Sequence, residues 1–287
     1  MTAQYIAAKS VADAISLAQA CGNGARLIAG GTDLVIQMRR KVCAPTHLID
    51  IQPIDELKQV RVGDREIEIG ATVTHKEIER LFSSHSQLAG LVESVRIVGG
   101  HQIRNSGTIG GNICNASPAA DLLPILLTLE AEIELQGPNG RRREKLANFL
   151  TGPGRTTRRP DEILTRIVFA RLPPSAASAF LRAGRRRAME ISLVSAAVLL
   201  VVDESRTCRV ARIAIGAAAP TAFRAREAEA CLTGGSLTAE ALHAASEAAA
   251  AAARPLSDVR ASETYRRRLV RVITRRALEA SVKRIGQ

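Results

Sequence analysis

The stretch Leu27-Ile28-Ala29-Gly30-Gly31-Thr32-Asp33-Leu34 has a counterpart about eighty residues later, Thr108-Ile109-Gly110-Gly111-Asn112, and the two together decide the fold. Each places two adjacent glycines where we expect the backbone to turn tightly, beside hydroxyl or amide side chains. Because glycine lacks a Cβ, the main chain there can adopt positive φ and approach a phosphate closely. Successive exposed N–H groups then form an anion-binding concavity. The pair therefore predicts a site that holds the pyrophosphate of a dinucleotide from two sides.

A single Gly-Gly pair is weak evidence, since most such pairs are ordinary turns. Neither stretch has the spacing of a P-loop or of a Rossmann fingerprint. The residues after the second stretch indicate the start of a helix, because Ser117 and Pro118 are typical of an N-cap and the first helical position. That helix places Asp121 one turn from its start. There the carboxylate either interacts with the helix N-terminus or accepts hydrogen bonds from sugar-like hydroxyls, and the sequence leaves both open.

With these flanking residues, the chain resembles the FAD-binding (medium) subunits of the molybdenum hydroxylases, the family of xanthine dehydrogenase and aerobic carbon monoxide dehydrogenase. Ala29–Leu34 is similar to the family loop A-G-G-x-[DS]-L, and Thr108–Asp121 to T-I-G-G-N-x-x-x-[AG]-[ST]-P-x-[AS]-D. The resemblance covers nearly the whole chain. It extends through Ile103–Asn105, Asp161–Leu164, Ile215–Gly216, Ala219–Thr221, Ser257–Ser262 and Tyr265–Arg267.

The resemblance implies that this chain binds FAD and needs no catalytic side chain of its own, because the flavin carries the redox chemistry. Leu164 matches a family position that lines the flavin. Arg182 matches a position, often Lys, that contacts the cofactor, and a solvated surface charge is the alternative. The residues implied at the cofactor are Leu27, Ile28, Ala29, Gly30, Gly31, Thr32, Asp33, Leu34, Thr108, Ile109, Gly110, Gly111, Asn112, Asp121, Leu164 and Arg182.

The implied fold is α+β. It consists of two small N-terminal FAD-binding subdomains of the PCMH/vanillyl-alcohol-oxidase type and a C-terminal α+β domain of the CO dehydrogenase flavoprotein type. We expect the FAD-binding domain at residues 1–172, with subdomains at about 1–55 and 56–172, and the C-terminal domain at 179–287.

The implied function is that of an electron-transfer subunit of a multi-subunit oxidoreductase. A large partner would carry the molybdenum cofactor and a small partner the [2Fe-2S] clusters, in a dimer of heterotrimers. Electrons would pass through the FAD of this chain to NAD, a quinone or oxygen. Val98, where relatives often have an aromatic residue, and Met189-Glu190, where NAD-using relatives often have acidic pairs, leave that acceptor open. The alternative is a stand-alone FAD-dependent reductase or oxidase of the same fold, which would need a proton donor for which no motif is evident.

Residue patterning independently favours α+β, because strands and helices occur without regular βαβ alternation. A Gly-Asp turn predicts a hairpin over 60–70, Thr74–Glu77 is a capping box, and 172–178 has the composition of a linker. We expect further strands at 26–29, 47–51, 132–135, 162–169, 193–202 and 208–215, and further helices at 11–18, 221–231, 238–252 and 262–282.

Composition excludes several other classes of protein. The five cysteines form no C-x-x-C pair or His/Cys cluster, which argues against a metal site, and the five histidines are isolated, which favours structural roles. The basic residues behind the net charge of +12 are scattered along the chain, with no aromatic residues placed between them. We therefore expect no nucleic-acid partner and favour acidic partner subunits. We expect no membrane span, and the odd cysteine count without a signal peptide favours the cytoplasm.

Overall fold

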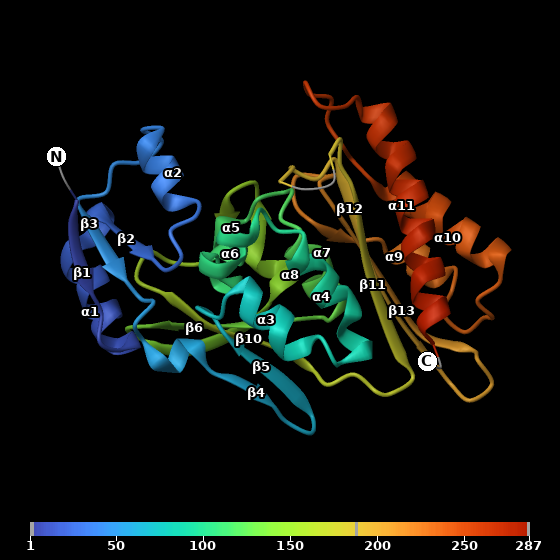
Figure 1. The fold of residues 1–287 in the computed structure, drawn as a ribbon, viewed down its shortest axis with the longest axis horizontal. Coiled ribbons are helices and arrows are strands. Elements are labelled where there is room, and N and C mark those ends of the chain that lie inside the picture. Colours follow the sequence, from blue (N-terminus) through green and yellow to red (C-terminus); the bar gives the residue numbers. More distant parts are fainter. Residues whose placement is uncertain (1–2, 187–188, 286–287) are drawn as a thin grey trace.

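A computed structural model describes residues 3–186 and 189–285, which form three main sheets with helices between and beside them (Figure 1). The first sheet is small and parallel, in the order β1-β3-β2, and α1 packs against it. Ser10 begins α1 as predicted, since its side chain accepts a hydrogen bond from the Asp13 N–H. The bounds are β1 Gln4–Ala7, α1 Val11–Cys21, β2 Ala25–Ile28, α2 Leu34–Arg39 and β3 His47–Asp50.

The second sheet is antiparallel, in the order β4-β5-β10-β6-β7. The predicted hairpin over 60–70 is confirmed as β4 and β5, in which buried and half-buried residues alternate along β5. One face of this sheet therefore packs on a core and the other faces solvent. The bounds are β4 Val60–Val62, β5 Glu66–Gly70, β6 Glu132–Gly137, β7 Gly140–Lys145 and β10 Ile163–Ala170.

The third sheet, β11-β12-β13-β14, is covered on both faces (Figure 1). Helices α4 and α7 lie on one face, and α10 and α11 on the other. This double cover explains why β12 is an almost uninterrupted buried apolar run. The bounds are β11 Ala176–Ala183, β12 Val194–Val202, β13 Cys208–Gly216, β14 Phe223–Arg224, α9 Arg226–Ala230, α10 Ala239–Ala252 and α11 Glu263–Arg284.

Short helices fill the space between the second and third sheets (Figure 1). The predicted capping box begins the first of them, α3, where the Thr74 side chain and the Glu77 carboxylate bond each other's backbone N–H. The bounds are α3 His75–Phe82, α4 Ala89–Arg96, α5 His101–Ser106, α6 Ile109–Asn115, α7 Leu122–Thr128, α8 Leu146–Phe149, β8 Leu150–Gly152 and β9 Arg155–Thr156, with 3-10 turns at Gly22–Gly24, Asp55–Lys58 and Ser86–Leu88. Within the described ranges, no helix is both long and apolar enough to cross a membrane.

Outside the segments that form the cavity, two predictions differ from the structure. The expected linker at 172–178 already contains the start of β11, because its small residues serve close packing rather than flexibility. The expected helix at 221–231 is instead the short strand β14 followed by the five-residue helix α9.

The contact between α4 and β11 joins the central helices to the third sheet. A Cβ on Gly90 would lie 3.0 Å from the Ala179 carbonyl carbon, so glycine is required for this approach. The Ser178 hydroxyl donates to the Gln87 carbonyl at 2.6 Å and accepts from the Gly90 N–H at 3.0 Å. Farther along β11, the Phe180 N–H donates to the Glu93 carboxylate of α4 at 2.8 Å.

We expect Gly90→Val to lower the free energy of unfolding by roughly 2 kcal/mol, since the added methyls press on the β11 backbone and must displace it. Ala89→Val places the same final side chain at the adjacent half-buried position and is the control. Urea unfolding of both variants checks this, and equal losses in the two would contradict the close α4–β11 approach.

Candidate functional site

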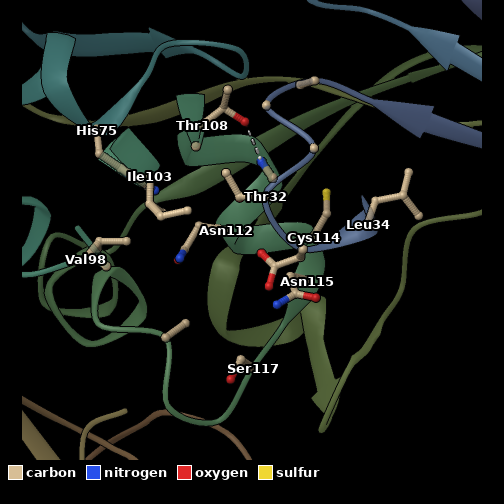
Figure 2. Close-up of a pocket in the computed structure, with 18 of the residues that line it drawn as sticks. Thr32, Leu34, His75, Val98, Ile103, Thr108, Asn112, Cys114, Asn115 and Ser117 are labelled. Carbon is tan, nitrogen blue, oxygen red and sulfur yellow. Dashed lines mark hydrogen bonds between the residues drawn. The ribbon is translucent and has the colours of Figure 1, made fainter. Parts of the chain in front are cut away.

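A cavity of about 620 Å³ opens between the first sheet, helices α5 and α6, and the segment after β11 (Figure 2). All eight residues of the first glycine stretch line it, together with Thr108, Gly111 and Asn112 from the second and with Asp121 beyond it. Residues about eighty positions apart in sequence therefore meet around one space. Its volume lies in the range typical of small-molecule and cofactor sites.

The first glycine stretch forms a tight loop between β2 and α2, as predicted. Gly31 has a φ of +66°, a conformation that glycine adopts without penalty. Gly30 lies against α5 so closely that a Cβ would come within 1.8 Å of the Ser106 carbonyl oxygen. Within the described residues, the backbone N–H groups of Gly30–Asp33 have no hydrogen-bond partner. The loop thus offers consecutive donors to an anion in the cavity.

The second glycine stretch is the first turn of α6, so the prediction of a tight turn there was wrong. Thr108 is the N-cap, and its hydroxyl accepts from the Gly111 N–H at 3.1 Å (Figure 2). The Ile109 and Gly110 N–H groups donate to the carbonyls of Val73 and Ala71. The N–H donors of this turn are therefore already used by the protein, and polar side chains remain for a ligand.

Two amide side chains of α6 face the cavity. The Asn112 Oδ1 atom is buried without a hydrogen-bond partner in the described structure. Asn115 accepts from the Gln37 side chain at 3.4 Å, which links α6 to α2. A buried polar atom without a partner costs free energy, so Asn112 is poised for a ligand.

Asp121 stands at the wall that faces the third sheet. It is the N-cap residue of α7, which begins at Leu122, so the helix expected from Ser117 and Pro118 was wrong and the Ser117 hydroxyl instead accepts from the Ala119 N–H. The Asp121 carboxylate accepts from the Ser192 hydroxyl at 2.6 Å and from Arg182 at 3.2 Å. Burial nevertheless raises the pKa of Asp121 to about 6, and these two contacts oppose that rise.

Four of the residues implied by the resemblance do not line the cavity. Ile109 and Leu164 are buried in the main core. Gly110 lies against Ala71, where a Cβ would come within 2.7 Å of the carbonyl oxygen. Arg182 is buried behind Asp121 and also donates to the Glu190 carbonyl at 2.9 Å. These residues support the cavity wall from behind.

The residue patterns missed His75, which lines the cavity although it was expected to be structural. Burial, assisted by the nearby Arg104 cation, lowers the pKa of His75 to about 4, so its imidazole is neutral near pH 7. A short bridge between Thr74 and Thr108 brings the start of α3 beside α6. The capping box indicated where α3 begins, but no local signal indicates which strand or loop lies next to it.

The cavity fits a flavin dinucleotide. The N–H groups of the first loop, which have no partner among the described residues, belong to residues that line it, and Asn112, whose side-chain oxygen lacks a partner there, lines it from α6. Gly30 has no side chain where the first loop meets Ser106 at the end of α5. Anionic phosphates and sugar hydroxyls are the partners that such donors and acceptors bind.

Comparison with known proteins matches both halves of the chain to described families. Residues 1–172 match the FAD binding domain in molybdopterin dehydrogenase, and residues 179–281 the CO dehydrogenase flavoprotein C-terminal domain. The xanthine dehydrogenase FAD-binding subunit of Escherichia coli O157:H7 is 33% identical over 99% of this chain and 97% of that protein. The carbon monoxide dehydrogenase medium chain of Hydrogenophaga pseudoflava is 31% identical over 97% of this chain and 96% of that protein.

Solved structures agree with these sequence matches. A Hydrogenophaga pseudoflava carbon monoxide dehydrogenase that lacks the Mo-pyranopterin moiety of its molybdenum cofactor superposes with a TM-score of 0.93 at 33% identity, over 100% of this chain and 99% of that chain. Quinoline 2-oxidoreductase from Pseudomonas putida 86 gives a TM-score of 0.91 at 26% identity, over 99% of this chain and 98% of that chain.

Gly30→Ala should weaken FAD binding at least about 100-fold, because the added methyl must push the first loop off the Ser106 carbonyl and so move its N–H donors. Gly152→Ala is the control, since its Cβ would meet nothing closer than 3.7 Å and Gly152 is not a cavity residue. Fluorescence titration of cofactor-free protein with FAD measures both. Unchanged affinity in Gly30→Ala would show that this contact does not position the site.

Asp121 should make the cofactor-free chain less stable as the pH rises from 4 to 6. Its pKa is about 6 when folded and 3.8 in the reference state, so the folded chain binds more protons between these values. The stability of the wild type relative to Asp121→Asn should therefore fall by about 2 kcal/mol over this range and level off above pH 7. Chemical unfolding at several pH values checks this, and a difference that grows with pH would mean that the Arg182 pair outweighs burial.

Proposed function

The chain belongs to the FAD-binding medium subunits of molybdenum hydroxylase-type dehydrogenases, and from this membership we propose that it passes electrons from a partner's iron–sulfur clusters through FAD to an external acceptor. It is a subunit of an oxidoreductase, and FAD is its cofactor. When bound, FAD supplies the redox chemistry. The chain's own residues bind the dinucleotide, orient it and exclude water from it.

The observation that carries this proposal is the row of unpartnered N–H groups at Gly30–Asp33, which line one side of the cavity. These donors would hold the pyrophosphate, and Thr108 and Asn112 would face it from α6. Asp121 would accept hydrogen bonds from flavin hydroxyls. The remaining direct contacts would come from Leu27, Ile28, Ala29, Leu34 and Gly111, whereas Ile109, Gly110, Leu164 and Arg182 would act through the residues they support.

We propose that residues 1–172 form the FAD-binding domain, with subdomains at about 1–55 and 56–172, and that residues 179–287 form the C-terminal flavoprotein domain. The family matches over 1–172 and 179–281 support this division. The C-terminal part would complete the site, since Arg182 and Ser192 both bond the Asp121 carboxylate.

The proposed partners are a large subunit with the molybdenum cofactor and a small subunit with [2Fe-2S] clusters, assembled as a dimer of heterotrimers. Support comes from relatives that are a "medium chain" or a "complex subunit", and from a related structure of a Cu,Mo-CO dehydrogenase. The net charge of +12 suits acidic partner surfaces. We also propose a cytoplasmic location, which the five free cysteines favour.

An absorbance spectrum of the purified chain, with the released cofactor identified by mass, tests the cofactor site. We expect oxidised-flavin bands and the mass of FAD. Gly111→Asp should bind FAD at least about tenfold more weakly than the isosteric Gly111→Asn, because its carboxylate repels the pyrophosphate. A chain that binds no FAD when FAD is in excess would overturn the proposal.

Co-purification and turnover separate the electron-transfer subunit from a stand-alone reductase or oxidase. We expect a complex that contains molybdenum and iron and turns over with NAD, a quinone or oxygen. The isolated flavin-loaded chain should not oxidise substrates of the complex. Turnover by the chain alone would favour the stand-alone enzyme instead.

A further inference from the structure

His75 is a polar cavity residue to which the proposed cofactor contacts give no role. It is the first residue of α3, and its backbone N–H donates to the Gly107 carbonyl at 3.1 Å. The imidazole lies beside Gly107, because a Cβ on that glycine would meet the ring Cδ2 at 3.3 Å and Nε2 at 3.4 Å. The ring thus stands next to the residue that leads into Thr108, at the wall of the cavity (Figure 2).

The His75 side chain is buried and has no hydrogen-bond partner in residues 3–186 and 189–285. Its residue is 2% exposed, and the Nδ1 atom is buried without a hydrogen bond. Within the described residues, no side-chain hydrogen bond involves His75. A neutral imidazole carries one N–H donor and one acceptor nitrogen, and buried polar groups of this kind normally have partners. We therefore expect the molecule that occupies the cavity to supply the hydrogen-bond partner of His75.

We propose that His75 is a positioning residue of the flavin site, where its imidazole forms a hydrogen bond with the bound dinucleotide. This inference rests on the proposed function. The ring is neutral at working pH, since burial and the Arg104 cation both disfavour its charged form. His75 therefore orients the cofactor by a hydrogen bond and adds no positive charge beside it.

A second histidine of the chain provides a matched comparison. His85 also has a buried Nδ1 without a hydrogen bond. Its ring packs edge-on against Phe82, with the ring centroids 5.5 Å apart, and it is not a cavity residue. An imidazole nitrogen can thus be buried without a hydrogen bond in this chain through packing alone, and the cavity position distinguishes His75 from that case.

The test uses the full-length chain and the variants His75→Leu, His75→Gln and His85→Leu, each freed of cofactor and titrated with FAD. We expect His75→Leu to bind FAD about tenfold more weakly, the effect of one lost hydrogen bond. His75→Gln, which keeps a neutral donor and acceptor, and His85→Leu should stay within about threefold of the wild type. The absorbance maximum and the reduction potential of the bound flavin should shift in His75→Leu and return in His75→Gln.

The melting temperature of each cofactor-free variant separates positioning from folding. If His75→Leu binds FAD as tightly as the wild type with an unchanged spectrum, the inference fails while the proposed function stands. It also fails if His75→Gln loses as much affinity as His75→Leu in step with a lower melting temperature, because that result indicates a structural role. If the wild-type chain binds no FAD, both the inference and the proposed function fall.

Discussion

The contact of Gly30 with the Ser106 carbonyl is the constraint on which the site depends. It holds the loop after β2 against α5, and so joins the small parallel sheet to the central helices. The loop fixed there lines the cavity, and its Gly30–Asp33 N–H groups have no hydrogen-bond partner in the part of the chain that the structure describes. A side chain at position 30 would part the two segments. Preorganised donors bind an anion without the cost of ordering a mobile loop.

The far wall of the cavity depends on the third sheet in the same way. The close α4–β11 packing at Gly90 holds that sheet against the central helices, and β11 carries Arg182 to Asp121. At the end of α11, Arg284 pairs with Glu93 and donates to the Ser178 carbonyl at 2.6 Å, so the C-terminal helix secures the same junction. The C-terminal half thus shapes the cofactor cavity as well as covering it. A substitution at this junction, far from the cavity, would therefore displace β11 and with it the Arg182 side chain that contacts Asp121.

Much of the fold was predictable because its signals are local. The capping residue Ser10, the capping box at Thr74 and the turn of the 60–70 hairpin each lie within a few residues of the element they set. The first glycine loop was predictable for the same reason. For the second glycine stretch, the position at the cavity was predicted but the conformation was wrong. A Thr N-cap before Gly-Gly fits the start of a helix as well as a turn. His75 and the engagement of Arg182 with Asp121 depend on contacts between distant segments, which a local pattern does not encode.

A crystal structure of the chain with FAD tests the central claim most directly. We expect pyrophosphate oxygens within hydrogen-bond distance of the Gly30–Asp33 N–H groups, with the dinucleotide extending past Asn112 toward Asp121. A flavin bound elsewhere, or bound here while these N–H groups bond to the protein instead, would contradict it.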